Sequence, residues 1–335
     1  MEQFAALSGI SRPTISKYFH DPSSVRPKTR QRIEEALELH DYRPNFYAIN
    51  QNRKLTKNIG IVVPYLADPF FSEMARMIER YCIDAGYSPN LFSSHGDPEQ
   101  EIEILEGLRS MKPAGVLLAP IGRVSHKSKI EAFCSDVPTV LFDSNLDDVG
   151  ASFVGSDNYS FVSQTVEYLT QTGTAPSFLE MRTPANPNAR KRRAAYIQKM
   201  EDMSLTPKIL SIDGTGWEFE EIGRAGGMKL IAENALQADT VLCSNDRLAI
   251  GFLSACYANG LRVGRSVECD LRVASHDDHP LSRFACPALT TAAHDYASVS
   301  ERSVETLFDL IADGGSTQTR SEVLFPARLV VRASA

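Results

Sequence analysis

The first forty-five residues constrain the fold of this chain more than any other part of it. Residues 3–18 read QFAALSGISRPTISKY, in which two short helical patterns flank a turn. Gly9 stands where the first helix should end, at a position that tolerates a positive φ. Ser11 suits the N-cap of the second helix, and Pro13 falls in its first turn, where a missing N–H costs little. The pattern predicts a helix-turn-helix unit, whose second helix enters the major groove of DNA.

The spacing of apolar residues predicts a small core of three helices. The inward-facing residues follow helical periodicity, one group for each helix: Phe4, Ala5 and Leu7; Ile15, Tyr18 and Phe19; Ile33, Ala36 and Leu37. Arg12, Ser16 and Lys17 lie on another face. Taken alone, the same residues also fit a helical cap with solvated basic side chains, so both interpretations stay open at this point.

Three short runs in this segment carry a specific motif. They read A-x-x-S-G-I-S-x-x-T-I-S from Ala5, V-x-x-x-T-R-x-R-I from Val25 and Y-x-P-N from Tyr42. The motif resembles the lac repressor / galactose repressor family of bacterial transcription regulators. The resemblance implies a sequence-specific DNA-binding regulator, more often a repressor, that responds to a small effector.

The resemblance also implies which side chains contact DNA. Arg12, Pro13 and Lys17 occupy the family's base-reading positions: Arg12 and Lys17 are able to donate to guanine, and Pro13 to touch a thymine methyl. A second group is expected to position the phosphates: Ser11, Thr14, Ser16 and Lys28.

Residues 46–58 are expected to form a hinge between the headpiece, residues 1–45, and the rest of the chain. In the family this segment resembles N-x-x-A-x-x-L, and its leucine wedges into the minor groove. Counting from Asn45 and Ala48 places Gln51 in the leucine slot. Glutamine supplies hydrogen bonds but no apolar wedge. We therefore expect Asn45 and Gln51 to contact DNA, with a weaker central kink or a shifted hinge register. In relatives several more residues precede the position of Met1, which fits a longer natural N-terminus.

After residue 58 the periodicity changes to that of an α/β protein. Residues 59–63 form a continuously apolar run, typical of a strand buried on both faces of a parallel sheet. Strand and helix patterns then alternate, with helices expected over 98–111, 158–172 and 189–202. This spacing favours open sheets covered by helices on both faces, which bind ligands at the carboxyl ends of their strands.

Two blocks of this kind predict two sheet subdomains with a cleft between them. The resemblance implies a periplasmic-binding-protein-like core in which the chain crosses between subdomains three times. The first subdomain should hold residues 59–156 and 290–320, and the second 157–289 and 321–335. Tetrameric relatives carry a further helical heptad segment after the position of Arg332, which is not seen here, so we expect a dimer.

Candidate effector residues fall at the expected ends of strands. Sugar sites combine aromatic faces with planar polar groups. Resemblance to family segments implies these candidates: Asp68, Phe70, Phe71, Asp143, Arg192, Trp217, Asn245, Asp277 and His294. Structural roles compete with this interpretation. Either phenylalanine could belong to the core, and Arg192 and Asn245 could make structural bonds. Asp68 and Asp277 could be helix caps or solvated loop residues.

Composition narrows the classes of function. Residues 1–58 contain ten Lys/Arg and six Asp/Glu, a balance of +4, whereas the remaining residues carry 25 and 36, a balance of −11. A basic N-terminal segment on an otherwise acidic chain is suited to contact the phosphates of DNA through that segment alone. No apolar run reaches the roughly 18 residues of a membrane span, and no export signal is seen, so we expect a cytoplasmic protein. The six cysteines are scattered, and we expect no metal and no cofactor.

Two other functions stay open on the sequence alone. One is a cytoplasmic sugar-binding protein without a regulatory role, and the other is an α/β enzyme. No phosphate-cradling glycine loop and no G-x-S-x-G elbow occur in the chain, so we expect no enzyme. The expected partners are operator DNA, a sugar, polyol or sugar phosphate, and a second copy of the chain.

Overall fold

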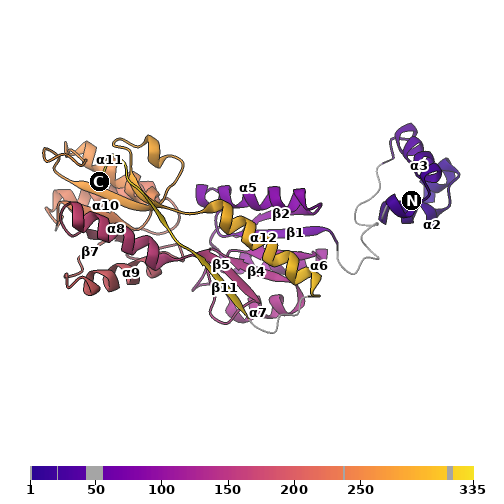
Figure 1. The fold of residues 1–335 in the computed structure, drawn as a ribbon, viewed down its shortest axis with the longest axis horizontal. Helices are drawn as coiled ribbons and strands as arrows, with labels where there is room; N and C mark the ends of the chain where they lie inside the picture. Colours follow the sequence, from indigo (N-terminus) through magenta and orange to yellow (C-terminus); the bar gives the residue numbers. More distant parts are fainter. Residues whose placement is uncertain (1, 21, 43–55, 237, 315–319) are drawn as a thin grey trace. The chain divides into compact units, whose positions relative to one another are not determined.

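A computed structural model describes residues 2–20, 22–42, 56–236, 238–314 and 320–335. The chain divides into two compact units, Met1–Thr56 and Lys57–Ala335, which Figure 1 labels by element. We call them the headpiece and the core. Within the described ranges, no helix is long and apolar enough to cross a membrane.

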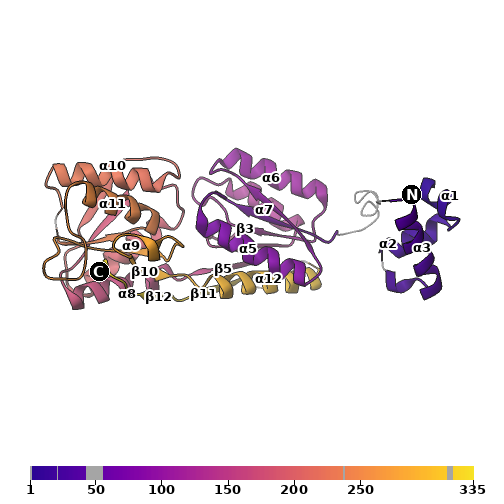
Figure 2. The ribbon, with the colours of Figure 1, turned by 90° about the horizontal axis from the view of Figure 1, so that it is seen from above.

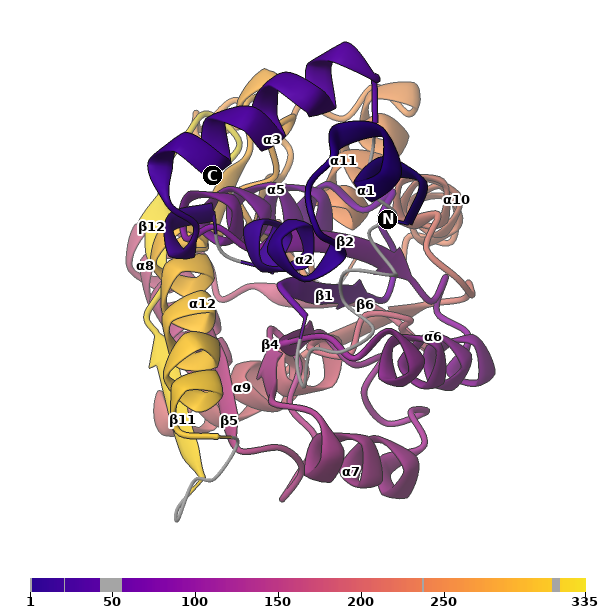
Figure 3. The same ribbon diagram turned by 90° about the vertical axis from the view of Figure 1, so that its right-hand side faces the viewer.

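Within its described residues the headpiece contains three α-helices (Figure 3). They are α1 (Glu2–Ser8), α2 (Arg12–His20) and α3 (Pro27–Leu39), with a short 3-10 turn, η1 (Pro22–Ser24), between the last two. Gly9 has φ +64°, so the turn between α1 and α2 uses the left-handed conformation expected of it.

Five apolar side chains form the centre of the headpiece: Phe4, Ile10, Ile15, Val25 and Ile33. The predicted inward position of Leu7 is wrong, because its side chain is 61% exposed. Leu7 lies in the last turn of α1, and the turn at Gly9 carries Ile10 inward in its place. Tyr42 covers this apolar cluster of the headpiece by stacking on Phe4, with ring centroids 4.3 Å apart.

The core contains two six-stranded sheets. The first has the order β11-β5-β4-β3-β1-β2, and all its strands run parallel. Its strands are β1 (Asn58–Val63), β2 (Ser88–Ser93), β3 (Gly115–Leu118), β4 (Thr139–Phe142), β5 (Ser152–Ser156) and β11 (Ser321–Phe325). β1, β3 and β4 are buried at every position, as expected of strands covered on both faces.

Helices cover this first sheet in two pairs. α5 (Pro69–Asp84) packs with α12 (Tyr296–Ala312), and α6 (Pro98–Met111) with α7 (Lys127–Asp136). The two pairs contribute to separate apolar clusters.

The second sheet has the order β12-β10-β9-β8-β6-β7, in which only β12 runs antiparallel to its neighbour. Its strands are β6 (Ser177–Met181), β7 (Ile209–Ile212), β8 (Thr240–Cys243), β9 (Arg272–Asp277), β10 (Thr290–Ala293) and β12 (Arg328–Val330). Its helices are α8 (Asn158–Thr172), α9 (Ala189–Asp202), α10 (Phe219–Ala232) and α11 (Asp246–Ala258), with the 3-10 turn η2 (Ser282–Phe284).

The chain crosses between the sheets three times, but two predicted subdomain boundaries are wrong. Residues 290–320 were expected in the first subdomain, yet β10 pairs with β9 in the second sheet. Residues 321–335 were expected in the second, yet β11 pairs with β5 in the first sheet, beside α12 in Figure 2. The burial explains both placements: β10 is buried at every position and fits between two strands, whereas β11 is largely exposed and fits a sheet edge.

Candidate functional site

The predicted DNA-contacting side chains of the headpiece lie at its surface. Those that are exposed are Ser11, Arg12, Pro13, Ser16, Lys17 and Lys28, and Thr14 is half-buried. Ser11 Oγ and Thr14 Oγ1 lie 2.8 Å apart at the start of α2. Arg12 donates to the carboxylate of Glu2 over 2.9 Å, and both side chains remain mostly exposed. The predicted contacts Asn45 and Gln51 lie outside the described residues.

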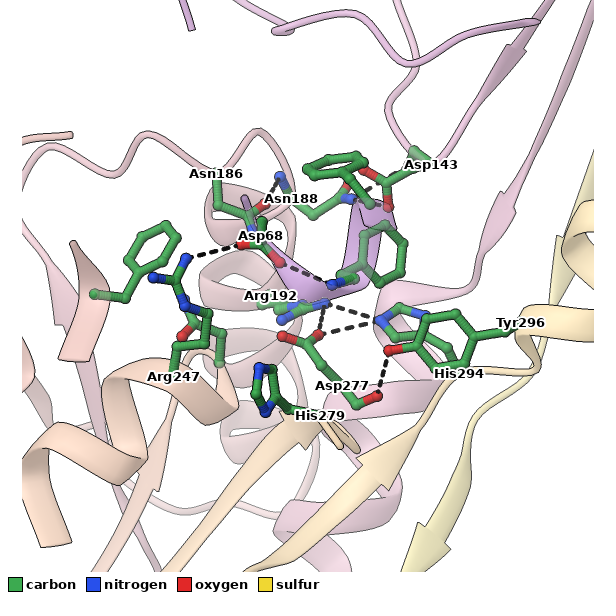
Figure 4. Close-up of a pocket in the computed structure, with 14 residues that line it drawn as sticks. Asp68, Asp143, Asn186, Asn188, Arg192, Arg247, Asp277, His279, His294 and Tyr296 are labelled. Carbon is green, nitrogen blue, oxygen red and sulfur yellow. Dashed lines mark hydrogen bonds and ion pairs between the residues drawn. The ribbon is translucent and has the colours of Figure 1, made fainter. Parts of the chain in front are cut away.

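A pocket lies between the two subdomains of the core, and we call it the cleft pocket (Figure 4). Its lining residues are Asp68, Phe70, Phe71, Asp143, Asn186, Asn188, Arg192, Phe219, Asn245, Arg247, Asp277, His279, His294 and Tyr296. They follow the carboxyl ends of strands in both sheets. The side chains leave about 20 Å³ of free space, which is room for about one water molecule.

A buried ion pair forms the floor of the cleft pocket. Arg192 donates from Nη2 to Asp277 Oδ1 over 2.6 Å and from Nη1 to the carbonyl oxygen of Ser244 over 2.8 Å. His294 Nε2 lies 3.1 Å from the same Asp277 oxygen. Burial alone would raise the pKa of Asp277, but Arg192 and His294 hold that pKa below its ordinary value. The Asp277 carboxylate is therefore charged and oriented at neutral pH.

The backbone at Asp277 is unusual. Its φ is +118°, a value that side-chain-bearing residues rarely adopt. Such conformations cost of order 1–3 kcal/mol and persist only where surrounding contacts hold them, often at ligand sites. Here Tyr296 donates a hydrogen bond to the Asp277 carbonyl oxygen over 3.1 Å, so both backbone and side chain are held.

An ion pair also spans the cleft. Asp68 is the N-cap of α5 and accepts the N–H of Phe70 over 2.9 Å. Its other oxygen accepts from Arg247 of α11 over 3.1 Å. Arg247 holds Glu220 with two further bonds of 2.7 Å. Burial raises the pKa of Asp68, and Arg247 opposes that rise.

Asp143 presents a different electrostatic case. It directly follows β4, has φ +59° and accepts from the Asn188 side chain over 3.0 Å, a contact that also joins the two subdomains. No arginine or lysine forms an ion pair with it within the described ranges. Burial raises the pKa of Asp143 to about 7, so this carboxyl changes charge near neutral pH.

His279 brings an unused hydrogen-bond donor to the pocket. Its Nδ1 accepts the N–H of Leu281 over 3.0 Å, which places the ring hydrogen on Nε2. The residue is 5% exposed, and Nε2 is buried without a partner among the described residues. Burial lowers the pKa of His279, which keeps the ring neutral. A buried donor of this kind is costly unless something accepts from it.

All predicted effector residues line this pocket except Trp217. That ring is 7% exposed and stacks on Tyr65 across the cleft, with centroids 5.2 Å apart. Asn245 has a structural role as well, because it caps α11 by accepting from Leu248 N over 2.8 Å. Sequence reasoning missed these lining residues: Asn186, Asn188, Phe219, Arg247, His279 and Tyr296. Their position just after predicted strands, or next to predicted site residues, was the available signal.

The fold and the pocket define a class: a helical DNA-binding headpiece joined to a two-subdomain ligand-binding core. Comparison with family models agrees with this class. The model described as "Bacterial regulatory proteins, lacI family" matches residues 1–45, and the "Periplasmic binding protein-like domain" matches residues 166–335. The chain belongs to the lac repressor family of bacterial transcription regulators.

Similar proteins cover nearly the whole chain. The ribose operon repressor of Escherichia coli (strain K12) is 26% identical over 325 residues, which is 96% of each chain. The NTD biosynthesis operon regulator NtdR of Bacillus subtilis (strain 168) is 22% identical over 334 residues, covering 100% of this chain and 99% of NtdR. The crystal structure of the lac repressor dimer bound to operator and the anti-inducer ONPF aligns with a TM-score of 0.83 and 25% identity, covering 99% of this chain and 97% of that one.

Proposed function

We propose that this protein is an operator-binding repressor whose affinity for DNA is set by a sugar-like effector in the cleft pocket. The observation that carries the proposal is the position of the pocket. Its lining comes from both subdomains, so a ligand bound there contacts both and favours one of their relative orientations. As an operator-binding regulator, the protein would act in the cytoplasm.

The hydrogen-bonding groups of the pocket support a polyhydroxylated ligand. Sugar hydroxyls donate well to carboxylates, which Asp143 and Asp277 supply at the pocket wall. A ring or hydroxyl oxygen would accept from the unpartnered His279 Nε2–H. Phe70 and Phe219 provide the apolar faces on which sugar rings pack. We assign no catalytic role to these residues.

Entry of the effector would have to widen the cleft, because the present free space is far smaller than a sugar. Contacts that resist widening include Asp68–Arg247, Asp143–Asn188 and the stack of Tyr65 on Trp217. An effector would replace some of them with its own hydroxyl contacts and shift the population of subdomain orientations. Effector and operator would then change each other's affinity by the same factor.

On the DNA side we assign base reading to Arg12, Pro13 and Lys17, all exposed on α2. Phosphate contacts go to Ser11, Thr14, Ser16 and Lys28, and hinge contacts to Asn45 and Gln51. A dimer would present two headpieces to two half-sites, the arrangement that helix-turn-helix dimers use. The lac repressor relative is itself a dimer bound to operator.

Fluorescence anisotropy with labelled duplexes from the chain's own upstream region tests the proposal. The full-length protein should bind one duplex better than a scrambled one, and a member of a panel of D-ribose, other sugars and polyols should change that affinity. Arg192→Lys, which keeps a positive charge beside Asp277 but loses the forked donor geometry, should weaken the sugar response and leave operator binding in place. Sugar binding with no effect on DNA would favour a non-regulatory binding protein, and turnover of a sugar would favour an enzyme.

A further inference from the structure

A second hollow lies beside the cleft pocket. It has a volume of about 150 Å³, and Asn186 lines both spaces. Its lining residues are Gly96, Ile121, Arg123, Val124, Pro184, Ala185, Asn186, Pro187, Arg190 and Trp217. We call it the arginine hollow, because its only charged lining residues are Arg123 and Arg190.

The two arginines come from opposite subdomains. Arg123 follows β3 of the first sheet, and Arg190 is the second residue of α9 beside the second sheet. Both side chains are exposed, and within the described ranges neither has an ion pair or a hydrogen bond from its guanidinium group. Two like charges that face one space across a closed cleft repel each other unless an anion lies between them.

The backbone adds to this positive field. α9 has 14 residues, and its first turn, which contains Arg190, carries the positive end of the helix dipole. The Ala189 N–H of that turn already donates to the carbonyl oxygen of Asn186 over 3.3 Å. The N-cap residue Asn188 makes no side-chain capping bond there: its Nδ2 donates to Asp143 over 3.0 Å, and its Oδ1 accepts from Asn158 over 3.5 Å. Helix N-termini combined with arginine are a common setting for phosphate and carboxylate groups.

The cleft pocket itself has the opposite character. Arg192 is balanced by Asp277, and Arg247 by Asp68 and Glu220, while Asp143 adds a further acid. An anionic group inside it would meet carboxylates that have no spare cation. A negatively charged group is therefore better accommodated in the arginine hollow, and uncharged hydroxyls in the adjacent cleft pocket.

We propose that the arginine hollow binds an anionic group, a phosphate or a carboxylate, attached to the sugar effector. The effector is then a sugar phosphate or a sugar acid, with its hydroxyls in the cleft pocket and its anionic group between Arg123 and Arg190. This inference rests on the proposed function for the sugar part. The anion would join one arginine from each subdomain and so stabilise the subdomain orientation that holds the effector.

Isothermal titration calorimetry on the full-length protein tests the hollow with inorganic phosphate as the probe, at constant ionic strength maintained with NaCl. Wild type should bind phosphate saturably with one site per chain. Arg123→Ala and Arg190→Ala should each weaken binding about tenfold, and the double variant should show none. Arg265→Ala, an exposed arginine outside the hollow, is the matched control and should behave as wild type.

A second arm compares D-ribose with D-ribose 5-phosphate and D-glucose with D-glucose 6-phosphate and D-gluconate. The anionic member of a set should bind more tightly than its parent in wild type and lose that advantage in the double variant. Identical phosphate binding by wild type and the double variant, or none by wild type, would overturn the inference. If uncharged sugars then still alter operator affinity, the proposed function stands. Arginine-dependent binding that leaves operator affinity unchanged would instead contradict the proposed function.

Discussion

Arg247, at the start of α11, donates a hydrogen bond over 3.1 Å to Asp68, the N-cap of α5, and joins the two subdomains across the cleft. Arg247 also packs over the ring of Phe219 at 5.1 Å and holds Glu220 on α10. α10 and α11 come unusually close here, since a Cβ on Gly251 would lie 2.0 Å from the carbonyl oxygen of Glu220. The cross-cleft ion pair is therefore mounted on a rigid helix pair.

Arg247→Ala should destabilise the core by about 3 kcal/mol, because it leaves the buried Asp68 carboxylate without its cation. Urea unfolding of the full-length protein at pH 7 measures the loss. In the double variant Asp68→Asn, Arg247→Gln no buried charge is stranded, so much of the stability should return. Equal losses in the single and double variants would show that the ion pair is not the cause.

The stability of the protein should depend on pH through Asp143. Its pKa is raised to about 7 in the folded chain by burial, above the ordinary value of 3.8. Between these two pH values the folded chain holds a proton that the unfolded chain has released. This contribution to stability is complete below about pH 4 and is lost as the pH rises through 7. Asp143→Asn should therefore gain stability relative to wild type between pH 5 and pH 8, as measured by urea unfolding across that range.

Asp277→Asn is a control for that experiment, because the pKa of Asp277 is shifted in the opposite direction to that of Asp143. The pKa of Asp277 is lowered in the folded chain, despite the opposing effect of burial, by Arg192 and His294. Its contribution is present above the ordinary pKa and is lost only in acid. Asp277→Asn should thus be destabilised by a nearly constant amount between pH 5 and pH 8. A rising trend in both variants would point to another titrating group.

Trp217 should report on the cleft by fluorescence. It is the chain's single tryptophan, and its ring lies nearly parallel to that of Tyr65, at an angle of 13°. Because Tyr65 follows β1 and Trp217 precedes α10, any change in subdomain orientation alters this stack. Effector or operator binding should shift the tryptophan emission, and Tyr65→Leu should reduce the shift. Unchanged emission during a titration in which calorimetry detects effector binding would contradict this.

Arg12→Ala should weaken operator binding by about 1–3 kcal/mol and relax the preference for one base pair. Mobility shifts with operator variants and scrambled DNA measure both effects. Lys28→Ala, at an expected phosphate contact, should weaken binding to operator and to scrambled DNA by the same factor. Arg12 donates to the carboxylate of Glu2 in the headpiece, so Glu2→Gln should release the Arg12 side chain and tighten operator binding. The increase should be small, because an exposed ion pair contributes little free energy. An equal loss on operator and scrambled DNA with Arg12→Ala would remove its base-reading role.

Local chemistry determined much of the secondary structure from sequence. The helices expected over 98–111 and 158–172 occur with those bounds, and the structure shows why: Asp97 and Asp157 cap them by accepting backbone N–H groups. Capping, turn glycines and apolar periodicity act within a few residues, so they can be read along the chain. The predicted effector residues that follow strands were likewise identifiable, since parallel strands bring their carboxyl ends together.

Only the tertiary structure decided the contacts between distant segments. β11 was assigned to the wrong sheet because its sequence does not specify which of two sheet edges it will cover. Arg247 and Asp68 are 179 positions apart, and Arg123 and Arg190 belong to different subdomains. Such neighbours depend on how two separately folded sheets close on each other. That closure is governed by the fit of whole surfaces, which no local pattern of residues encodes.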